Sequence, residues 1–338
     1  MSSIRSFPTA ALLFVPLATG CSDRSPDTSA GATAAGPVTP VASVSPPPAG
    51  PTAIVTETTT GTAPVSYADG ETAFRRGRYQ EATDLFAAYA AGHPDNAWGH
   101  YMHGLSAWKS GEHERALEGF DQALRLDPDH RKSLLNSARV LLETSRPREA
   151  LERIERALAL EPLSSDGLRL LGRARSELGE VPEAIDAYHR ALALDDRDAW
   201  SMNNLGLVYI QQGRFEEALP PLARAVELRA GSPVFQNNLG MALERAGHSA
   251  AARAAYAAAV ESDSTYAKAS ASLARLGGPV DSARTSATVD LAGLAREFEV
   301  QVEGWRGATG LARDSATIEQ TPTSAAGDTA GGEALIQE

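Results

Sequence analysis

Residues 97–130 read AWGHYMHGLSAWKSGEHERALEGFDQALRLDPDH, and the spacing of small and bulky residues in this stretch decides the fold. Gly104 and Ala116 are small, Gly111 between them is a turn residue, and Phe120 is bulky. The same residue types recur every 34 residues in six consecutive units. The recurring alanines are Ala82, Ala116, Ala150, Ala184, Ala218 and Ala252. A fixed period of this length is the signature of a protein built from stacked repeats.

Each unit predicts two antiparallel helices whose axes approach closely, because the residues at the crossing are small. The mid-unit turn residue is expected to take the left-handed conformation that ends the first helix. The bulky residues are expected to fill the gap between neighbouring units. The small residues of the first helices are Gly70, Gly104, Ala138, Gly172, Gly206 and Gly240; the turn residues are Gly77, Gly111, Ser145, Gly179, Gly213 and Gly247; the bulky residues are Phe86, Phe120, Ile154, Tyr188, Leu222 and Tyr256.

This pattern resembles the tetratricopeptide repeat family. The resemblance implies an all-α fold, a right-handed superhelical solenoid of six helix-turn-helix units with a concave inner groove. Ala138, Ser145 and Arg175 depart from the family pattern. The six expected units cover residues 63–266, as 63–96, 97–130, 131–164, 165–198, 199–232 and 233–266.

The segment after the repeats predicts two further helices. Residues 267–276 are expected to form a capping helix, because repeat arrays need a polar end. Residues 277–287 are expected to be a linker, and residues 288–305 an amphipathic helix with Leu291, Leu294, Phe298 and Val302 on one stripe. One hypothesis is that this helix folds into the groove as an autoinhibitory plug. The Thr-, Ala-, Gly- and Asp-rich residues 306–338 are expected to be a disordered tail.

The first residues have the layout of an export signal. Residues 1–20 combine an early cation with a short apolar run, and Leu17-Ala18-Thr19-Gly20-Cys21 resembles a bacterial lipoprotein signal. That resemblance implies lipidation at Cys21, and Ser22 favours the outer membrane. The alternative is an ordinary signal peptide in which the cysteine is incidental. Residues 21–62, rich in Pro, Ala and Thr, then predict a disordered tether.

Composition excludes several classes of function. The 338 residues carry 31 basic and 43 acidic side chains, a net charge of −12, which argues against nucleic acid as a partner. The single cysteine rules out an intramolecular disulfide. No phosphate-binding glycine loop, GxSxG elbow or HExxH motif is present, so no enzyme activity, cofactor, metal or small-molecule substrate is predicted. His100, His103 and His113 could form a metal site, but solvated positions are favoured.

The family resemblance also implies which first-helix side chains line the groove. Aromatic residues flank a basic middle, which suits an extended or helical peptide that carries apolar side chains and a carboxylate. Asn136, Asn204 and Asn238 share one register; they either hold a peptide or bond the backbone of a neighbouring helix. The arginines of the basic middle are either ligand contacts or a solvated face. The candidate residues are Tyr67, Phe74, Trp98, Tyr101, Leu105, Trp108, Lys132, Asn136, Arg139, Leu142, Arg169, Arg173, Trp200, Asn203, Asn204, Leu207, Asn237, Asn238 and Met241.

Together these patterns favour a membrane-anchored scaffold or assembly factor of the bacterial cell envelope. It would be exported, lipid-anchored to the outer membrane facing the periplasm, and would bind a protein or peptide partner in its groove. The alternative from another class is a regulatory subunit of an envelope enzyme, or a divergent enzyme that uses residues 281–338.

Overall fold

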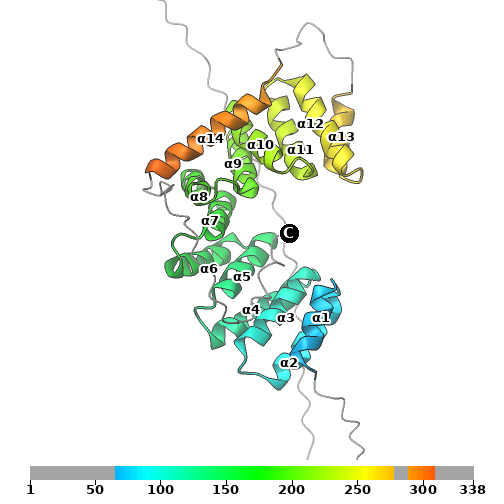
Figure 1. Ribbon diagram of the computed structural model, residues 1–338, viewed down its shortest axis with the longest axis vertical. Helices are drawn as coiled ribbons and strands as arrows, with labels where there is room; N and C mark the ends of the chain where they lie inside the picture. The colour runs from blue at the N-terminus through cyan, green and yellow to red at the C-terminus, as the bar shows by residue number, and fades with distance from the viewer. Residues whose placement is uncertain (1–64, 278–287, 309–338) are drawn as a thin grey trace, which may run out of the picture. The chain divides into compact units, whose positions relative to one another are not determined.

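The computed structural model describes residues 65–277 and 288–308, and within those ranges it contains fourteen α-helices and no strand (Figure 1). The predicted all-α repeat fold is confirmed. The first twelve helices form six pairs, each with a first and a second helix. The pairs are α1 (Tyr67–Arg75) with α2 (Tyr79–Gly92), α3 (Ala97–Lys109) with α4 (His113–Leu126), α5 (Arg131–Glu143) with α6 (Pro147–Leu160), α7 (Ser165–Glu177) with α8 (Val181–Leu194), α9 (Ala199–Gln211) with α10 (Phe215–Leu228), and α11 (Pro233–Arg245) with α12 (Ser249–Ser262). They are followed by α13 (Ala267–Arg275) and α14 (Leu291–Ala308).

From α1 to α13 the helices pack in chain order, each against the next. The first helices α3, α5, α7, α9 and α11 also contact one another in succession. We call the surface that they share the first-helix face. The predicted lipidation site, tether, linker and tail lie wholly or largely outside the described residues.

The turn inside each unit depends on a left-handed residue, as predicted. Gly111 has a φ of 86°, and its equivalents in four other units are also glycines with positive φ. Its N–H donates to the carbonyl of Trp108 at 2.9 Å, and the next N–H, of Glu112, donates to Ala107 at 2.8 Å, so carbonyls at the helix end are satisfied. In the third unit Ser145 takes the same conformation, with a φ of 58°.

Close approach of the paired helices explains the small residues. A Cβ atom added at Gly104 would lie 2.8 Å from the carbonyl oxygen of Ala116 and 2.9 Å from the backbone nitrogen of Phe120. The bulky residues also pack within their own unit: the Tyr188 ring lies against Gly172, where an added Cβ would meet it at 2.7 Å. In the five units that have a glycine at this place, the bulky residue packs against that glycine.

First and second helices begin differently. Before each first helix, a side chain accepts a hydrogen bond from a backbone N–H of the first turn, as Asn96 does from Gly99 at 3.0 Å. Second helices lack such a cap but, except in α12, carry a glutamate in the first turn, which favours the positive end of the helix dipole. The capping residues of the first helices are Ser66, Asn96, His130, Ser164, Asp198 and Ser232.

The C-terminal helix α14 lies along α8 and α10, which are second helices (Figure 1). Its apolar side chains Phe298 and Val302 join Tyr188 of α8 and Ala225 of α10 in one buried cluster. The hypothesis that this helix plugs the first-helix groove is therefore wrong, because the apolar surface that receives it is on the second helices. No helix of the described residues has the length and apolar character to cross a membrane.

Candidate protein-binding face

An aromatic group marks the N-terminal end of the first-helix face. The indole N–H of Trp98, on α3, donates to the Tyr67 hydroxyl of α1 at 2.6 Å. The Trp98 ring lies 4.9 Å from that of Tyr101, and the ammonium group of Lys132 lies 5.4 Å from its centroid. Trp98 is nevertheless 40% exposed. It is thus held in place by side chains of α1, of α5 and of its own helix, while part of its ring remains available to a partner.

Beneath Trp98, Tyr101 is buried and joins two units. Asn136 of α5 donates to its hydroxyl at 3.1 Å. Burial raises the pKa of Tyr101 to about 12, so the phenol stays neutral near pH 7. This bond links α3 to α5.

Trp108, near the C-terminal end of α3, has a polar partner. Its indole N–H donates to a carboxylate oxygen of Glu143, on α5, at 2.7 Å. The same carboxylate lies 3.5 Å from the His113 ring. Trp108 is half-buried, so it serves partly to connect neighbouring units.

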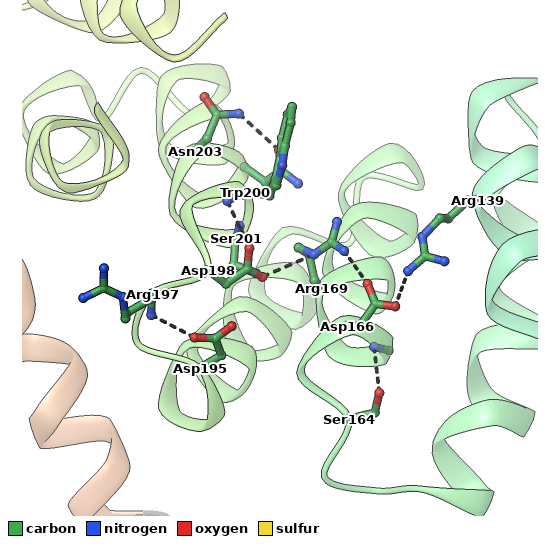
Figure 2. A network of polar contacts seen from close by, with 12 residues as sticks. Arg139, Ser164, Asp166, Arg169, Asp195, Arg197, Asp198, Trp200, Ser201 and Asn203 are labelled. Atoms are coloured by element: carbon green, nitrogen blue, oxygen red, sulfur yellow. Dashed lines mark hydrogen bonds and ion pairs between the residues drawn. The ribbon is translucent and has the colours of Figure 1, made fainter. Parts of the chain in front are cut away.

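The middle of the face is a chain of alternating charges (Figure 2). Arg139 of α5 and Arg169 of α7 both bind the Asp166 carboxylate. Arg169 also lies 3.2 Å from Asp198, the capping residue of α9. The chain runs through α5, α7 and the start of α9, so it ties three units together.

This arrangement corrects the prediction of a basic middle. Burial alone would raise the pKa of Asp166, but the guanidinium groups of Arg139 and Arg169 outweigh that effect and hold it below its ordinary value. Arg173, one turn further along α7, pairs with Glu177 at 2.9 Å. Because these arginines already have carboxylate partners, a ligand carboxylate is not needed to balance them.

The C-terminal end of the face carries the second exposed tryptophan. Trp200, on α9, is 41% exposed, and its ring meets that of Phe235, on α11, edge to face at 4.9 Å. Its backbone N–H donates to Asp198 at 3.0 Å, which fixes the start of the helix.

The repeated asparagines bond the preceding unit, through side chains. Asn238 donates to Asn203 at 2.8 Å, and Asn204 donates to the Tyr188 hydroxyl. With Asn136 on Tyr101, all three bond side chains of the unit before, and the expected bond to a neighbouring backbone is not the one observed. Of the three, only Asn204 is more than slightly exposed.

The histidines proposed as an alternative metal site have other surroundings. The Nε2 of His100 lies 3.1 Å from the carbonyl of Pro94, and burial lowers the pKa of His103. Within the described residues, no three His, Cys, Asp or Glu side chains form a group that could hold a metal ion.

Family comparisons agree with this geometry. Family models described as tetratricopeptide repeat match residues 107–174, 163–230 and 203–267. Residues 107–267 are thus similar to tetratricopeptide repeats. Arrays of this family are typical protein-interaction scaffolds, because their stacked units present an extended binding surface. No curated protein matches the chain in sequence.

Two solved structures with a TM-score above 0.5 share the fold. A chain of the APC/C hetero-tetramer Cut9–Hcn1 is 18% identical over 61% of this chain and 41% of that one, with a TM-score of 0.55. A tetratricopeptide repeat protein from Parabacteroides merdae is 15% identical over 61% and 81%, with a TM-score of 0.53. At these identities the likeness concerns the fold alone. A thermophilic tetratricopeptide repeat protein of Thermus thermophilus is 23% identical over 54% and 98%, with a TM-score of 0.49.

The structure divides the candidate residues of this repeat surface by exposure. Many are buried because neighbouring first helices cover them, and these serve packing more than recognition. The buried ones are Phe74, Tyr101, Leu105, Asn136, Leu142, Asn203, Asn237 and Asn238; the half-buried ones are Tyr67, Trp108, Arg139, Arg169, Arg173, Asn204, Leu207 and Met241; the exposed ones are Trp98, Lys132 and Trp200.

Sequence reasoning missed the acidic residues of the face, Glu143, Asp166 and Asp198. A signal for Asp166 existed in the repeat register. Asp166 occupies the position that Trp98 and Trp200 hold in their units, at the start of a first helix. It follows Arg139 by 27 residues, which places it on the next first helix.

Proposed function

We propose that the chain is a non-catalytic, membrane-anchored scaffold of the bacterial cell envelope that binds a protein segment on its first-helix face. One observation carries this proposal: Trp98 and Trp200 share one repeat register and are 40% and 41% exposed. Tryptophan dominates the binding energy of many interfaces, and a large apolar side chain left exposed at a repeated position indicates a contact surface.

The charges around the two tryptophans indicate the chemistry of the partner. Arg139 and Arg169 are neutralised by Asp166 and Asp198, so apolar and aromatic contacts carry most of the affinity. Within the described residues, Lys132 has no carboxylate at ion-pair distance and lies over Trp98. We therefore expect a partner segment with apolar side chains and one carboxylate, placed near Lys132.

The binding face is tested with single substitutions. Trp98→Ala and Trp200→Ala should each reduce capture of the envelope partner at least tenfold, since hot-spot residues contribute about 2 kcal/mol or more. Leu163→Ala is the matched control, because this side chain is 63% exposed in the loop after α6. Partners would be captured from solubilised envelopes and quantified by mass spectrometry. Proteins retained equally by all three variants would exclude the face as the binding site.

The proposed attachment depends on Cys21, the one cysteine of the chain. Several acyl chains on this residue would anchor the protein without a spanning helix. Cys21→Ser should move the protein from the membrane fraction to the soluble envelope fraction and abolish labelling by a fatty-acid analogue. Ser22→Ala, a neighbouring change that keeps the cysteine, should leave both unchanged. A Cys21→Ser protein that stays in the membrane fraction would rule out the anchor.

A further inference from the structure

The C-terminal end of helix α14 carries an aromatic ring and a buried arginine, and both contact the repeat array. Trp305 stacks on His189 of α8, with ring centroids 3.8 Å apart and planes 17° from parallel. One turn and two turns earlier, Val302 and Phe298 are 2% and 1% exposed. The apolar stripe of α14 is therefore fully engaged with the repeat array.

Arg306 anchors the end of α14 to the end of α8. Its guanidinium group is almost completely buried, donates from Nε to the carbonyl of Ala193 at 3.0 Å, and lies 3.2 Å from Asp196. Ala193 belongs to the last turn of α8, where carbonyls have no partner within the helix and the helix dipole is negative. Arg306 thus satisfies both a helix terminus and a carboxylate.

The surface of α10 on which α14 packs differs from the same surface of the other second helices. Pro220 is buried, whereas the residues at its register in the other units, Asp84, Glu118, Glu152, Asp186 and Ala254, are all exposed. The extra element that packs along α10 is α14, and Arg224 of α10 pairs with Glu299 of α14. The burial of Pro220 agrees with a surface that α14 covers.

The α14 helix shares a cavity and a hydrophobic cluster with the helix that carries Trp200. Met202 of α9 lines a cavity of about 480 Å³ together with Phe298 and Val302 of α14. The same hydrophobic cluster contains Tyr188, which accepts the bond from Asn204, and Phe235, on which the Trp200 ring rests. The supports of the Trp200 end of the first-helix face are thus shared with α14.

We propose that α14 is a strap that holds the Trp200 end of the first-helix face in its binding geometry, with Arg306 as the positioning residue. The binding part of this inference rests on the proposed function. Release of the strap loosens α9 and weakens the partner's contact at Trp200, while the Trp98 end, on α3, is unaffected because α14 does not pack there.

The strap is tested by hydrogen exchange on the full chain without a partner. Arg306→Ala should increase the exchange of amides in α14 and α9 at least tenfold and leave α3 unchanged. Arg296→Ala is the matched control, because Arg296 lies on the same helix with a side chain that is 67% exposed. Phe298→Ala, which removes a buried ring, should reproduce the Arg306→Ala result.

Three results would overturn the proposal. Faster exchange in α14 with unchanged exchange in α9 would show that the strap does not support the face. Unchanged exchange in α14 for both variants would show that the strap is not held as described. Faster exchange in α9 with unchanged capture of the partner would show that the strap does not act on binding, and reduced capture by Trp200→Ala in the same assay would show that the proposed function still stands.

Discussion

The second helices α6 and α10 have the same length and the same place in their units, yet their outward surfaces differ. Glu152 and Glu155 of α6 are exposed, and Glu155 pairs with Arg175 at 2.9 Å. At the same register α10 has Pro220 and Ala223, which are buried. The inward positions of a repeat determine the fold, and its outward positions determine whether a surface faces solvent or receives another helix.

Loss of the Phe298 ring should produce the largest difference between the two regions. Phe298→Ala should reduce the free energy of α14 docking by about 3 kcal/mol, because a buried aromatic ring leaves a cavity behind. Denaturant unfolding followed by circular dichroism would measure it. Val300→Ala, at a position 73% exposed on the same helix, should change stability by less than about 0.5 kcal/mol. Equal effects would contradict the assignment of the covered surface.

A carboxylate placed on the covered surface of α10 should have a smaller effect on stability. Pro220→Glu gives α10 the residue of α6, and it should be less stable than Pro220→Ala by about 2 kcal/mol, because the charge is buried beneath α14. Comparison with Pro220→Ala removes the contribution of the proline itself. Removal of the carboxylate from α6, Glu152→Ala, should lower the free energy of unfolding by less than about 0.5 kcal/mol. Thermal unfolding of the three variants would show whether the α10 surface alone rejects the charge.

Acidification should weaken α14 docking through His189. Burial lowers the pKa of His189 to about 4, whereas an undocked imidazole titrates near its ordinary value of about 6.5. The undocked state therefore binds the proton first, so docking is strongest above about pH 6.5 and weakens as the pH falls toward about 4. Fluorine NMR of a 5-fluorotryptophan label at Trp305 would follow docking.

The control for this pH dependence is His189→Phe, which keeps an aromatic ring against Trp305 but cannot titrate. It should keep α14 docked when the pH is lowered from 7 to 5. The same loss of docking in both proteins would assign the pH dependence to other groups.

A substitution in the turn of the third unit should have the smallest effect on stability. Ser145 has a φ of 58°, where the other five units have glycine. Ser145→Gly should raise the free energy of unfolding by at most about 1 kcal/mol, because the left-handed conformation is strained for a residue with a Cβ atom. Gly111→Ser should lower it by a similar amount. Thermal midpoints measure both, and a destabilised Ser145→Gly would show that the serine side chain contributes more than the strain costs.

The repeat fold was predictable because its constraints are local and recur at one spacing. Gly104 and Ala116 permit the crossing of paired helices, and Gly111 ends the first helix, so a short stretch of sequence specifies each unit. The placement of Tyr188 against Gly172 was not predicted, because periodicity gives the register of a bulky residue and not the gap that it fills.

The candidate face was predictable in part. Trp98 and Trp200 follow from the register, but the pairing of Arg139 and Arg169 with Asp166 depends on the angle between neighbouring units. That angle is a property of the stacked array and cannot be read from one unit.

The position of α14 could not be predicted from the sequence pattern either. Its stripe predicts an apolar helix face, but it does not say which surface receives that face. The signal was in α10, where Pro220 replaces a residue that is acidic in four other units, and it has meaning only once the cover is known.

The central claim is that a protein partner binds on the first-helix face, while the outward surface of α6 stays free. Site-specific photocrosslinking in intact cells tests it, with a photoreactive phenylalanine derivative placed at position 98, 200 or 152. The account predicts adducts with the same partner from positions 98 and 200 and none from position 152. Adducts from position 152 alone would contradict it.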